Sequence, residues 1–339
     1  MPPRVSVCIP TYNGAAFLAE TLASAVAQTF DDFEVVVVDD CSTDGSAEIA
    51  DGFARSDSRV RVIRNTERMG SGAANARVYV AQSRGEWIKP LNQDDLMAPE
   101  CLTRMLEASA RGPLVVCWHE LLFEADISAQ VRGWYEEGPT LAGELPGDFA
   151  DADSVCAAIL RRPTENFIGP TSSGFIHREC FAKHGFFDPT FSFFPDLDYW
   201  TRVGTREGIS IVARPVLTFR VHNASLSAAI RGDPRRAFRR DLQQVRRKLQ
   251  FARLPGFENI RRVAADLSPA VDLEERLRTS AFEIRWNAIE TRYRKRDPWP
   301  LAQWDALVAG DPEMQQLLRE IDGALPLSDR VRQFVKRRL

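Results

Sequence analysis

The chain has 339 residues, of which 44% are hydrophobic and 27% charged, and its formal net charge is −3. This composition is typical of a globular protein and excludes a disordered tail, a collagen-like fibre and a disulfide-stapled miniprotein. No apolar run approaches the roughly 18–20 residues that a membrane-spanning helix needs. The six cysteines are dispersed and lack zinc-binding spacing, which predicts buried free thiols in a reducing cytoplasm.

Short, β-branched apolar runs alternate with amphipathic segments over the first hundred residues. The runs predict strands buried on both faces over 5–10, 34–40, 60–63 and 86–91. Helical spacing between them predicts helices over 15–28, 47–55 and 73–83. This βαβαβ order predicts a mainly parallel sheet, with ligands at the carboxyl ends of its strands.

The pattern loosens after Asp95. We expect a helix over 99–110 and strands over 114–118, 174–176, 209–213 and 216–221. Residues 124–165 are only weakly periodic and indicate an inserted loop and helix. From about residue 235 the chain becomes helical and basic.

Two acidic pairs follow predicted strands, Asp39-Asp40 after the second and Asp94-Asp95 after the fourth. In a parallel sheet both pairs reach the same edge, where their mutual repulsion has to be offset by a cation or by hydrogen-bond donors. Hard oxygen ligands suit Mg²⁺ or Mn²⁺ bound together with a diphosphate. Taken singly, each pair also fits a helix cap or a turn. Neither a GxxxxGK[ST] loop nor a GxGxxG loop is present.

Five motifs then occur in order between residues 4 and 227: VSVCIPTYNGAAFLAETLASAVAQTFDDFEVVVVDDCSTDGS, GEWIKPLNQDD, SSGFIHREC, DLDYWTR and FRVHNASLS. Together they resemble family 2 glycosyltransferases, inverting enzymes that use nucleotide-sugar donors. The resemblance implies the α/β GT-A fold, a Rossmann-like, mixed and mainly parallel sheet flanked by helices, here followed by a C-terminal helical appendage. It also implies Mn²⁺ or Mg²⁺ as the cofactor.

The resemblance assigns the nucleotide-binding roles residue by residue. Pro10, Thr11 and Tyr12 match the loop that contacts the nucleoside. Asp40 matches the carboxylate that accepts a hydrogen bond from the base, as an anionic acceptor suits an N–H donor. Arg77 is expected to serve the diphosphate.

The remaining roles belong to the metal, the donor sugar and the reaction itself. Asp95 and His222 match metal ligands, and Asp94 matches a carboxylate of the ribose or metal shell. Gly174 matches the glycine of the loop that faces the donor sugar, where a side chain is expected to collide with the sugar. Asp196 matches the general base that takes the proton of the acceptor hydroxyl.

Three positions depart from the family pattern. Asn92 stands where a first carboxylate is usual, Pro195 precedes the expected base in place of an acidic residue, and Asn75 displaces the usual arginine to Arg77. Each departure bears on metal dependence or on the choice of donor.

The expected function is metal-assisted, single-displacement transfer of a sugar, with a UDP-sugar the expected donor. The acceptor is expected to be a hydroxyl of a saccharide, a lipid-linked saccharide or a protein-linked glycan. Residues 1–230 are predicted to form the catalytic domain, with a nucleotide-binding half over 1–98 and an acceptor half over 99–230. Two alternatives stay open: a nucleotidyltransferase of similar fold, and a non-catalytic scaffold that binds nucleotide-sugars.

The C-terminal region, residues 231–339, has a different charge from the rest. Residues 231–296 carry 18 basic and 9 acidic side chains, a net +9 that leaves −12 for the remainder. One interpretation is a solvated face or a homo-oligomer contact. Another is a peripheral contact with the inner face of the membrane, which the terminal VRQFVKRRL also fits. No nucleic acid partner is expected, because no recognition motif accompanies the charge.

Overall fold

The structure is a computed structural model that describes residues 2–225, 228 and 233–324. It divides into two compact units, Met1–Ala228 and Ala229–Leu339. The predicted membrane-contacting segment 331–339 lies outside the described residues.

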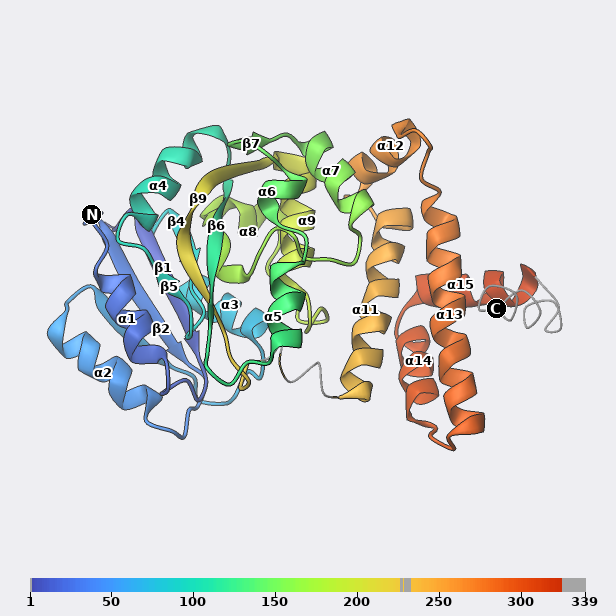
Figure 1. The fold of residues 1–339 in the computed structure, drawn as a ribbon, viewed down its shortest axis with the longest axis horizontal. Helices are drawn as coiled ribbons and strands as arrows, with labels where there is room; N and C mark the ends of the chain where they lie inside the picture. The colour runs from blue at the N-terminus through green and yellow to red at the C-terminus, as the bar shows by residue number, and fades with distance from the viewer. Residues whose placement is uncertain (1, 226–227, 229–232, 325–339) are drawn as a thin grey trace. The chain divides into compact units, whose positions relative to one another are not determined.

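One mixed sheet organises the first unit, with the strand order β3-β2-β1-β4-β8-β6-β9-β5 and β7 paired to β9 (Figure 1). Its strands are β1 (Val5–Thr11), β2 (Phe33–Asp39), β3 (Val60–Arg64), β4 (Trp87–Pro90), β5 (Leu96–Met97), β6 (Leu114–Phe123), β7 (Phe149–Ala150), β8 (Gly174–His177) and β9 (Ile209–Val221). Strands β3, β2, β1 and β4 are parallel, and β8 joins β4 and β6 in antiparallel orientation. The predicted α/β class and mixed sheet are confirmed.

Helices flank this sheet on both faces and follow the predicted alternation. They are α1 (Leu18–Val26), α2 (Ser46–Ser56), α3 (Gly72–Gln82), α4 (Cys101–Ala108), α5 (Ala129–Glu136), α6 (Leu141–Glu144), α7 (Ala152–Arg161), α8 (Arg178–His184) and α9 (Pro195–Glu207). Short 3₁₀ turns, η1 (Ser109–Arg111) and η2 (Thr171–Ser173), complete the unit. Side chains of α1, α2 and α4 share a core cluster with the odd-numbered residues of β1 and β2.

The prediction of two separate strands over 209–213 and 216–221 was wrong, because β9 runs through without a break. It pairs in parallel with β6, whose register shifts around Trp118, opposite Pro215. A proline has no backbone N–H to donate to the neighbouring strand. It is therefore tolerated where the strand pairing is irregular, as it is here, and not within a regular pairing. The long β6–β9 ribbon carries the chain from the core to His222.

The second unit is helical, as predicted. It contains α11 (Pro234–Arg253), α12 (Glu258–Asp266), α13 (Leu273–Arg294), α14 (Trp299–Ala309) and α15 (Pro312–Ala324). Its core cluster includes the fully buried Trp304. Arg253 donates to Glu274 at 2.9 Å and to Glu320 at 2.5 Å, which ties three helices together. Among the described residues, no helix has the length and apolar character needed to cross a membrane.

Candidate active site

The carboxyl end of β1 brings the predicted nucleoside loop beside the loop that follows β4. The backbone N–H of Tyr12 donates to Gln93 Oε1 at 2.9 Å, and Gln93 Nε2 donates back to the Tyr12 carbonyl at 3.2 Å. The guanidinium of Arg68 lies 3.8 Å from the centre of the Tyr12 ring. Pro10 and Thr11 pair with β2 immediately before this point. The predicted nucleoside loop is therefore fixed to the Asp94-Asp95 loop by an amide side chain.

Asp40 is buried and holds the loop before α3. Its carboxylate accepts hydrogen bonds from the backbone N–H of Met69 (2.7 Å) and of Gly70 (3.0 Å), and from Asn65 Nδ2 (2.8 Å). Burial on its own raises the pKa of Asp40, but these hydrogen bonds outweigh burial and set the pKa below its ordinary value. Asp40 is thus an ionised carboxylate whose two oxygens already have protein donors.

Its neighbour Asp39 has a freer carboxylate. Asp39 Oδ2 accepts from the backbone N–H of Ser42 at 3.3 Å, whereas Oδ1 is buried without a hydrogen-bond partner among the described residues. The buried Thr11 hydroxyl at the same edge is likewise without a described partner. Unpaired buried polar atoms are costly, so such a pair at a strand edge fits a place where a ligand supplies the missing partners.

Asp95 is fully buried between β4 and β9. Its Oδ2 accepts from Ser172 Oγ at 2.5 Å and Asn92 Nδ2 at 3.0 Å, and its Oδ1 accepts from the backbone N–H of Arg220 at 3.1 Å. Burial, followed by repulsion from Asp94, raises the pKa of Asp95 to about 7. Both oxygens are engaged, so this predicted metal ligand joins strands rather than facing solvent.

Asp94 and the buried His222 form the acidic and basic pair of the site. Asp94 Oδ2 lies 2.9 Å from His222 Nε2, and the Asp94 side chain is 20% exposed. The imidazole packs on Phe17, with ring centres 4.6 Å apart. Arg220 donates to the Asp94 carbonyl at 3.0 Å. The two sequence-distant residues that the resemblance places near the metal therefore lie in direct contact.

This pair fits a hard divalent cation that also binds a diphosphate. Mg²⁺ is typically held by one or two carboxylates together with phosphate oxygens and water, so it does not require a complete protein cage. His222 Nδ1 is buried without a partner among the described residues, and the donor set is carboxylate and imidazole. Within the described part of the chain, no group of three His, Cys, Asp or Glu side chains is arranged to hold a metal.

Asp196 lies in the first turn of α9, directly after Pro195 at the helix start. Its Oδ2 accepts from Asn166 Nδ2 at 3.1 Å, and its Oδ1 accepts from the backbone N–H of Leu197 at 2.8 Å. A helix N-terminus stabilises an ionised carboxylate. Asp198, in contrast, is buried and paired with Arg202 at 2.8 Å, which makes it a structural residue.

One segment, residues 166–174, links Asp196 to the metal-side loop. At one end, Asn166 Nδ2 donates to Asp196 and to the Gly169 carbonyl. At the other, Ser172 Oγ donates to Asp95 and accepts from the backbone N–H of Asn92 at 2.9 Å. The fully buried ammonium of Lys89 donates to the Ser172 carbonyl. Residues from three separate motifs, Asp95, Gly174 and Asp196, thus gather at this one segment.

Gly174 begins β8 at this segment, but it faces a protein side chain. A Cβ built at Gly174 would lie 2.2 Å from Cη2 of Trp200, a residue of α9. Trp200 Nε1 donates to the Gly169 carbonyl at 3.2 Å. The structure therefore requires glycine here for packing of the indole, and the donor-sugar role stays a prediction.

Arg77 is exposed on α3, and its guanidinium lies 5.1 Å from the ring centre of Phe186. The two amide departures have structural partners: Asn92 donates to Asp95, and Asn75 accepts from Asn65 Nδ2 at 2.8 Å. Neither replacement leaves a gap in the hydrogen bonding of the site.

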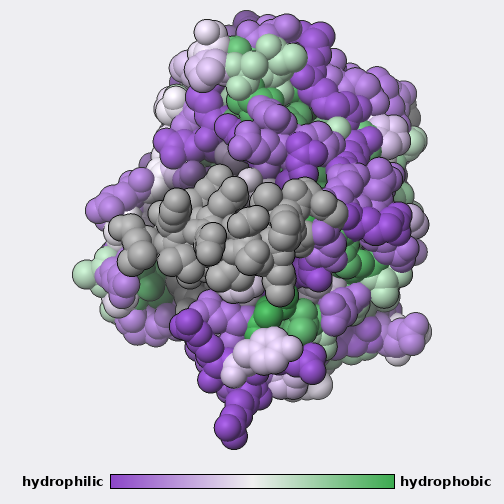
Figure 2. Space-filling model, turned by 90° about the vertical axis from the view of Figure 1, so that its right-hand side faces the viewer, coloured by the Kyte–Doolittle hydropathy of each residue, from purple (hydrophilic) through white to green (hydrophobic). Residues whose placement is uncertain are grey.

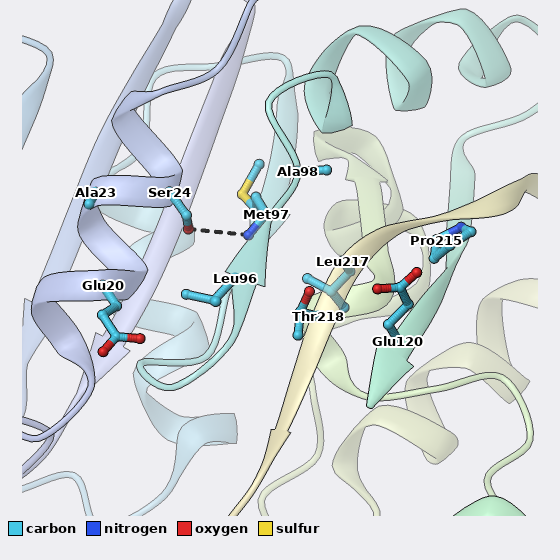
Figure 3. Close-up of a pocket in the computed structure, with 10 residues that line it drawn as sticks. All are labelled: Glu20, Ala23, Ser24, Leu96, Met97, Ala98, Glu120, Pro215, Leu217 and Thr218. Atoms are coloured by element: carbon cyan, nitrogen blue, oxygen red, sulfur yellow. Dashed lines mark hydrogen bonds between the residues drawn. The ribbon is translucent and has the colours of Figure 1, made fainter. Parts of the chain in front are cut away.

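A pocket of about 500 Å³ lies apart from these residues, between α1, β5 and the β6–β9 ribbon (Figure 3). In Figure 3 its β5 wall is joined to α1 by the bond from the Met97 backbone N–H to Ser24 Oγ, 3.2 Å long. Glu20 and Glu120 give it an acidic lining, and Glu20 pairs with Arg220 at 2.5 Å. None of the predicted site residues lines it.

Sequence reasoning missed the residues that orient the site. Asn166 lies outside the matched motifs, and Ser172 and Lys89 lie inside them without a predicted role, so only their partners in space identify them as residues of the site. The unpaired oxygen of Asp39 was also missed. The sequence Asp39-Asp40 does not indicate which of the two carboxylates accepts the hydrogen bonds from the loop at 65–70.

Comparisons with known proteins show which sequences the chain resembles. The family described as Glycosyl transferase family 2 matches residues 6–167. The putative glycosyltransferase EpsH of Bacillus subtilis (strain 168) is 35% identical over 141 residues, 40% of each chain. The succinoglycan biosynthesis protein ExoO of Rhizobium meliloti (strain 1021) is 39% identical over 111 residues, 32% of this chain and 31% of its own. The match to the glycosyltransferase GlyG of Streptococcus pneumoniae spans 32% of that protein. The chain thus matches about a third to two fifths of these relatives.

Solved structures share the fold at low sequence identity. S. aureus TarS 1–349 in complex with UDP-GlcNAc has a TM-score of 0.57 at 15% identity, covering 88% of this chain and 89% of that one. The mannosyltransferase PcManGT of Pyrobaculum calidifontis, in complex with GDP-Man and Mn²⁺, has a TM-score of 0.50 at 17% identity, covering 96% and 89%. The family match over residues 6–167, the sheet topology and the gathered acidic motifs make the chain similar to glycosyltransferase family 2.

Proposed function

We propose that the chain is an inverting glycosyltransferase that moves a sugar from a nucleotide-sugar to an acceptor hydroxyl. The observation that carries the proposal is the segment 166–174, which contacts the Asp94-Asp95 loop at one end and Asp196 at the other. A donor diphosphate near Asp94 and an acceptor near Asp196 would then meet across one segment. TarS, a neighbour in fold, is described with UDP and UDP-GlcNAc, which supports a UDP-sugar as the donor.

On the donor side, Thr11 and Tyr12 contact the nucleoside, Asp40 holds the bordering loop, and Arg77 serves the diphosphate. The geometry favours Asp94 over Asp95 as the carboxylate that reaches a cation, because Asp95 is fully buried and engaged. Asp94 and His222 would hold Mn²⁺ or Mg²⁺. Such a cation, when bound, neutralises charge on the departing diphosphate.

On the acceptor side, Asp196 takes the proton of the attacking hydroxyl. The new bond from that oxygen to the anomeric carbon forms as the bond to the diphosphate breaks, on the opposite face of the sugar. Asn166 and the backbone N–H of Leu197 hold the carboxylate in its orientation. A positioned base of this kind contributes about 10²–10⁴-fold to rate.

An aromatic row next to the segment 166–174 suits a saccharide acceptor. His119 lies 3.5 Å from Ser173 Oγ, and its ring centre is 6.0 Å from that of Phe219. Tyr135 continues the row at 6.0 Å from Phe219, and Trp134, 62% exposed, lies 4.8 Å from Tyr135. The apolar C–H faces of pyranose rings pack on such rings while their hydroxyls stay solvated. The row supports a glycan acceptor longer than one sugar.

The experiment follows the leaving group. Purified protein is given UDP-sugars with Mn²⁺, and released nucleoside diphosphate and pyrophosphate are measured for the wild type and Asp196→Asn. We expect nucleoside diphosphate, a loss of at least about 100-fold in Asp196→Asn, and unchanged UDP affinity. Asp153→Asn, in the first turn of α7, is the matched control and should keep full turnover.

The two alternatives predict different products. A nucleotidyltransferase would release pyrophosphate, and a scaffold would bind nucleotide-sugars without releasing either product. Full turnover in Asp196→Asn would remove this residue from the base role even if the enzyme proves to be a transferase.

A further inference from the structure

One end of the helical second unit carries a cluster of basic and aromatic side chains. No part of the proposed reaction uses this cluster. The cluster, here called the basic end, joins the first turns of α11 to the end of α13 and the loop before α14. Its basic residues are Arg235, Arg236, Arg239, Arg240, Arg292, Arg294, Lys295 and Arg296. Figure 1 places these two helix ends and the start of α14 at the same end of the unit.

Direct contacts join the start of α11 to the start of α14 in the basic end. The guanidinium groups of Arg235 and Arg239, one helical turn apart, each lie 5.3 Å from the ring centre of Trp299. Phe238 packs edge-on against the same indole, with centres 6.2 Å apart. The end of α13 reaches this indole within a few residues of chain. The basic end is therefore one surface.

Much of its charge is not neutralised by the protein. Arg236 pairs with Asp233, Arg240 with Asp241, and Arg294 with Glu290. The other basic residues of this surface have no carboxylate within ion-pair distance among the described residues. These are Arg235, Arg239, Arg292, Lys295 and Arg296.

An exposed aromatic ring lies in the middle of this charge. Tyr293 is 76% exposed, between Arg292 and Arg294. Figure 2, which looks onto this side of the molecule, shows hydrophilic side chains on either side of a hydrophobic and pale patch at its lower end. Tyrosine and tryptophan favour the headgroup level of a bilayer, where an apolar ring and a polar tip are both satisfied. Basic side chains favour an anionic surface.

We propose that the basic end docks the protein on an anionic lipid surface. The charge complementarity requires an anionic partner, and the exposed aromatic ring among cations favours a lipid headgroup layer over a nucleic acid. The inference concerns the second unit and does not depend on the transferase chemistry of the first. If the acceptor proves to be lipid-linked, such docking would hold the enzyme at its substrate.

The test compares vesicle binding of full-length variants by co-sedimentation. The probes are vesicles of phosphatidylcholine alone and with about 30% phosphatidylglycerol, at low salt and at about 0.5 M salt. Each basic residue near an anionic surface is worth about fivefold in partitioning, so Arg292→Gln, Lys295→Gln and Arg296→Gln combined should lose about 100-fold. Tyr293→Ala should weaken binding further.

A matched control removes the same charge elsewhere in the unit. The control combines Arg262→Gln, Arg276→Gln and Arg278→Gln. These residues lie in α12 and the first turns of α13, and Arg276 is about 27 Å along α13 from Arg294. This control should bind like the wild type, and all variants should keep the wild-type rate of nucleoside diphosphate release in free solution.

Three results would overturn the docking proposal. The first is that the wild type does not bind vesicles, or binds them equally well without phosphatidylglycerol. The second is that the two triple variants lose vesicle binding equally. The third is that the wild type binds polyuridylate in preference to the vesicles. If the wild type does not turn over nucleotide-sugars, the proposed function is contradicted, and the vesicle result is unaffected.

Discussion

Replacing Gly174 by alanine tests why a glycine stands at the start of β8. The added Cβ would lie 2.2 Å from Cη2 of Trp200 and 2.9 Å from Cζ2 of the same ring. Ordinary contacts are about 3.4–4 Å, so the indole has to move by more than an ångström. Trp200 is fully buried and packs against Phe187 and Tyr199, so it has no free space in which to move.

Overpacking of this kind costs about 1–3 kcal/mol, and displacement of the indole also breaks its hydrogen bond to the Gly169 carbonyl, worth about 1 kcal/mol. We therefore expect a loss of about 3 kcal/mol for Gly174→Ala in urea unfolding of the first unit. For a unit of this size, that corresponds to a fall in Tm of about 6–12 °C. Gly169 also supports Asn166 beside Asp196, so transfer should fall as well.

The control is Gly72→Ala at the start of α3, where a Cβ meets nothing within 4 Å and alanine is the better helix former. It should leave stability unchanged or raise it by up to about 1 kcal/mol. If Gly174→Ala unfolds like the wild type but loses donor affinity, the packing explanation is refuted and the sequence-based one, collision with the donor sugar, is supported.

Three further perturbations address the metal-side loop and the acceptor row. Asp94→Asn should weaken UDP binding by about tenfold or more with Mn²⁺ but not in EDTA, by calorimetry; equal losses in both would exclude contact with the cation. The raised pKa of Asp95, about 7, means that the folded state retains a proton which the unfolded state loses near pH 4, so the contribution of Asp95 to the stability of the first unit in EDTA should fall as pH rises from about 4 to about 7. Asp95→Asn should flatten that dependence, and an unaltered urea-midpoint profile would contradict the buried, protonated carboxyl. Trp134→Ala should raise KM for an oligosaccharide acceptor about tenfold without changing donor hydrolysis, whereas an equal effect on monosaccharide acceptors would contradict the extended row.

The sequence alone predicts the alternating half of the fold well. Buried runs such as 34–40 and amphipathic stretches such as 47–55 report burial directly, since a strand covered on both faces has few polar positions. The continuous β9 was not predicted, because Pro215 is compatible with a strand only through the local irregularity of its partner β6.

For the site, sequence motifs identify which residues gather but not which atoms are free. Asp94 and Asp95 are equivalent as a pattern, yet one is partly exposed beside His222 and the other is buried under Ser172 and Arg220. That difference arises from β9 and η2, which are more than seventy residues away in the chain. Long-range pairing therefore decides the orientation of each carboxylate, and local spacing does not encode it.

Crystals grown with UDP and Mn²⁺ offer the most direct test of the proposed site, through the anomalous signal of the cation. The signal is predicted within bonding distance of Asp94 and His222. The uracil ring is predicted to lie beside Tyr12, and the diphosphate on the side of Asp196. A cation bound away from both residues, or a nucleotide bound away from the carboxyl ends of β1 and β2, would contradict the proposed arrangement.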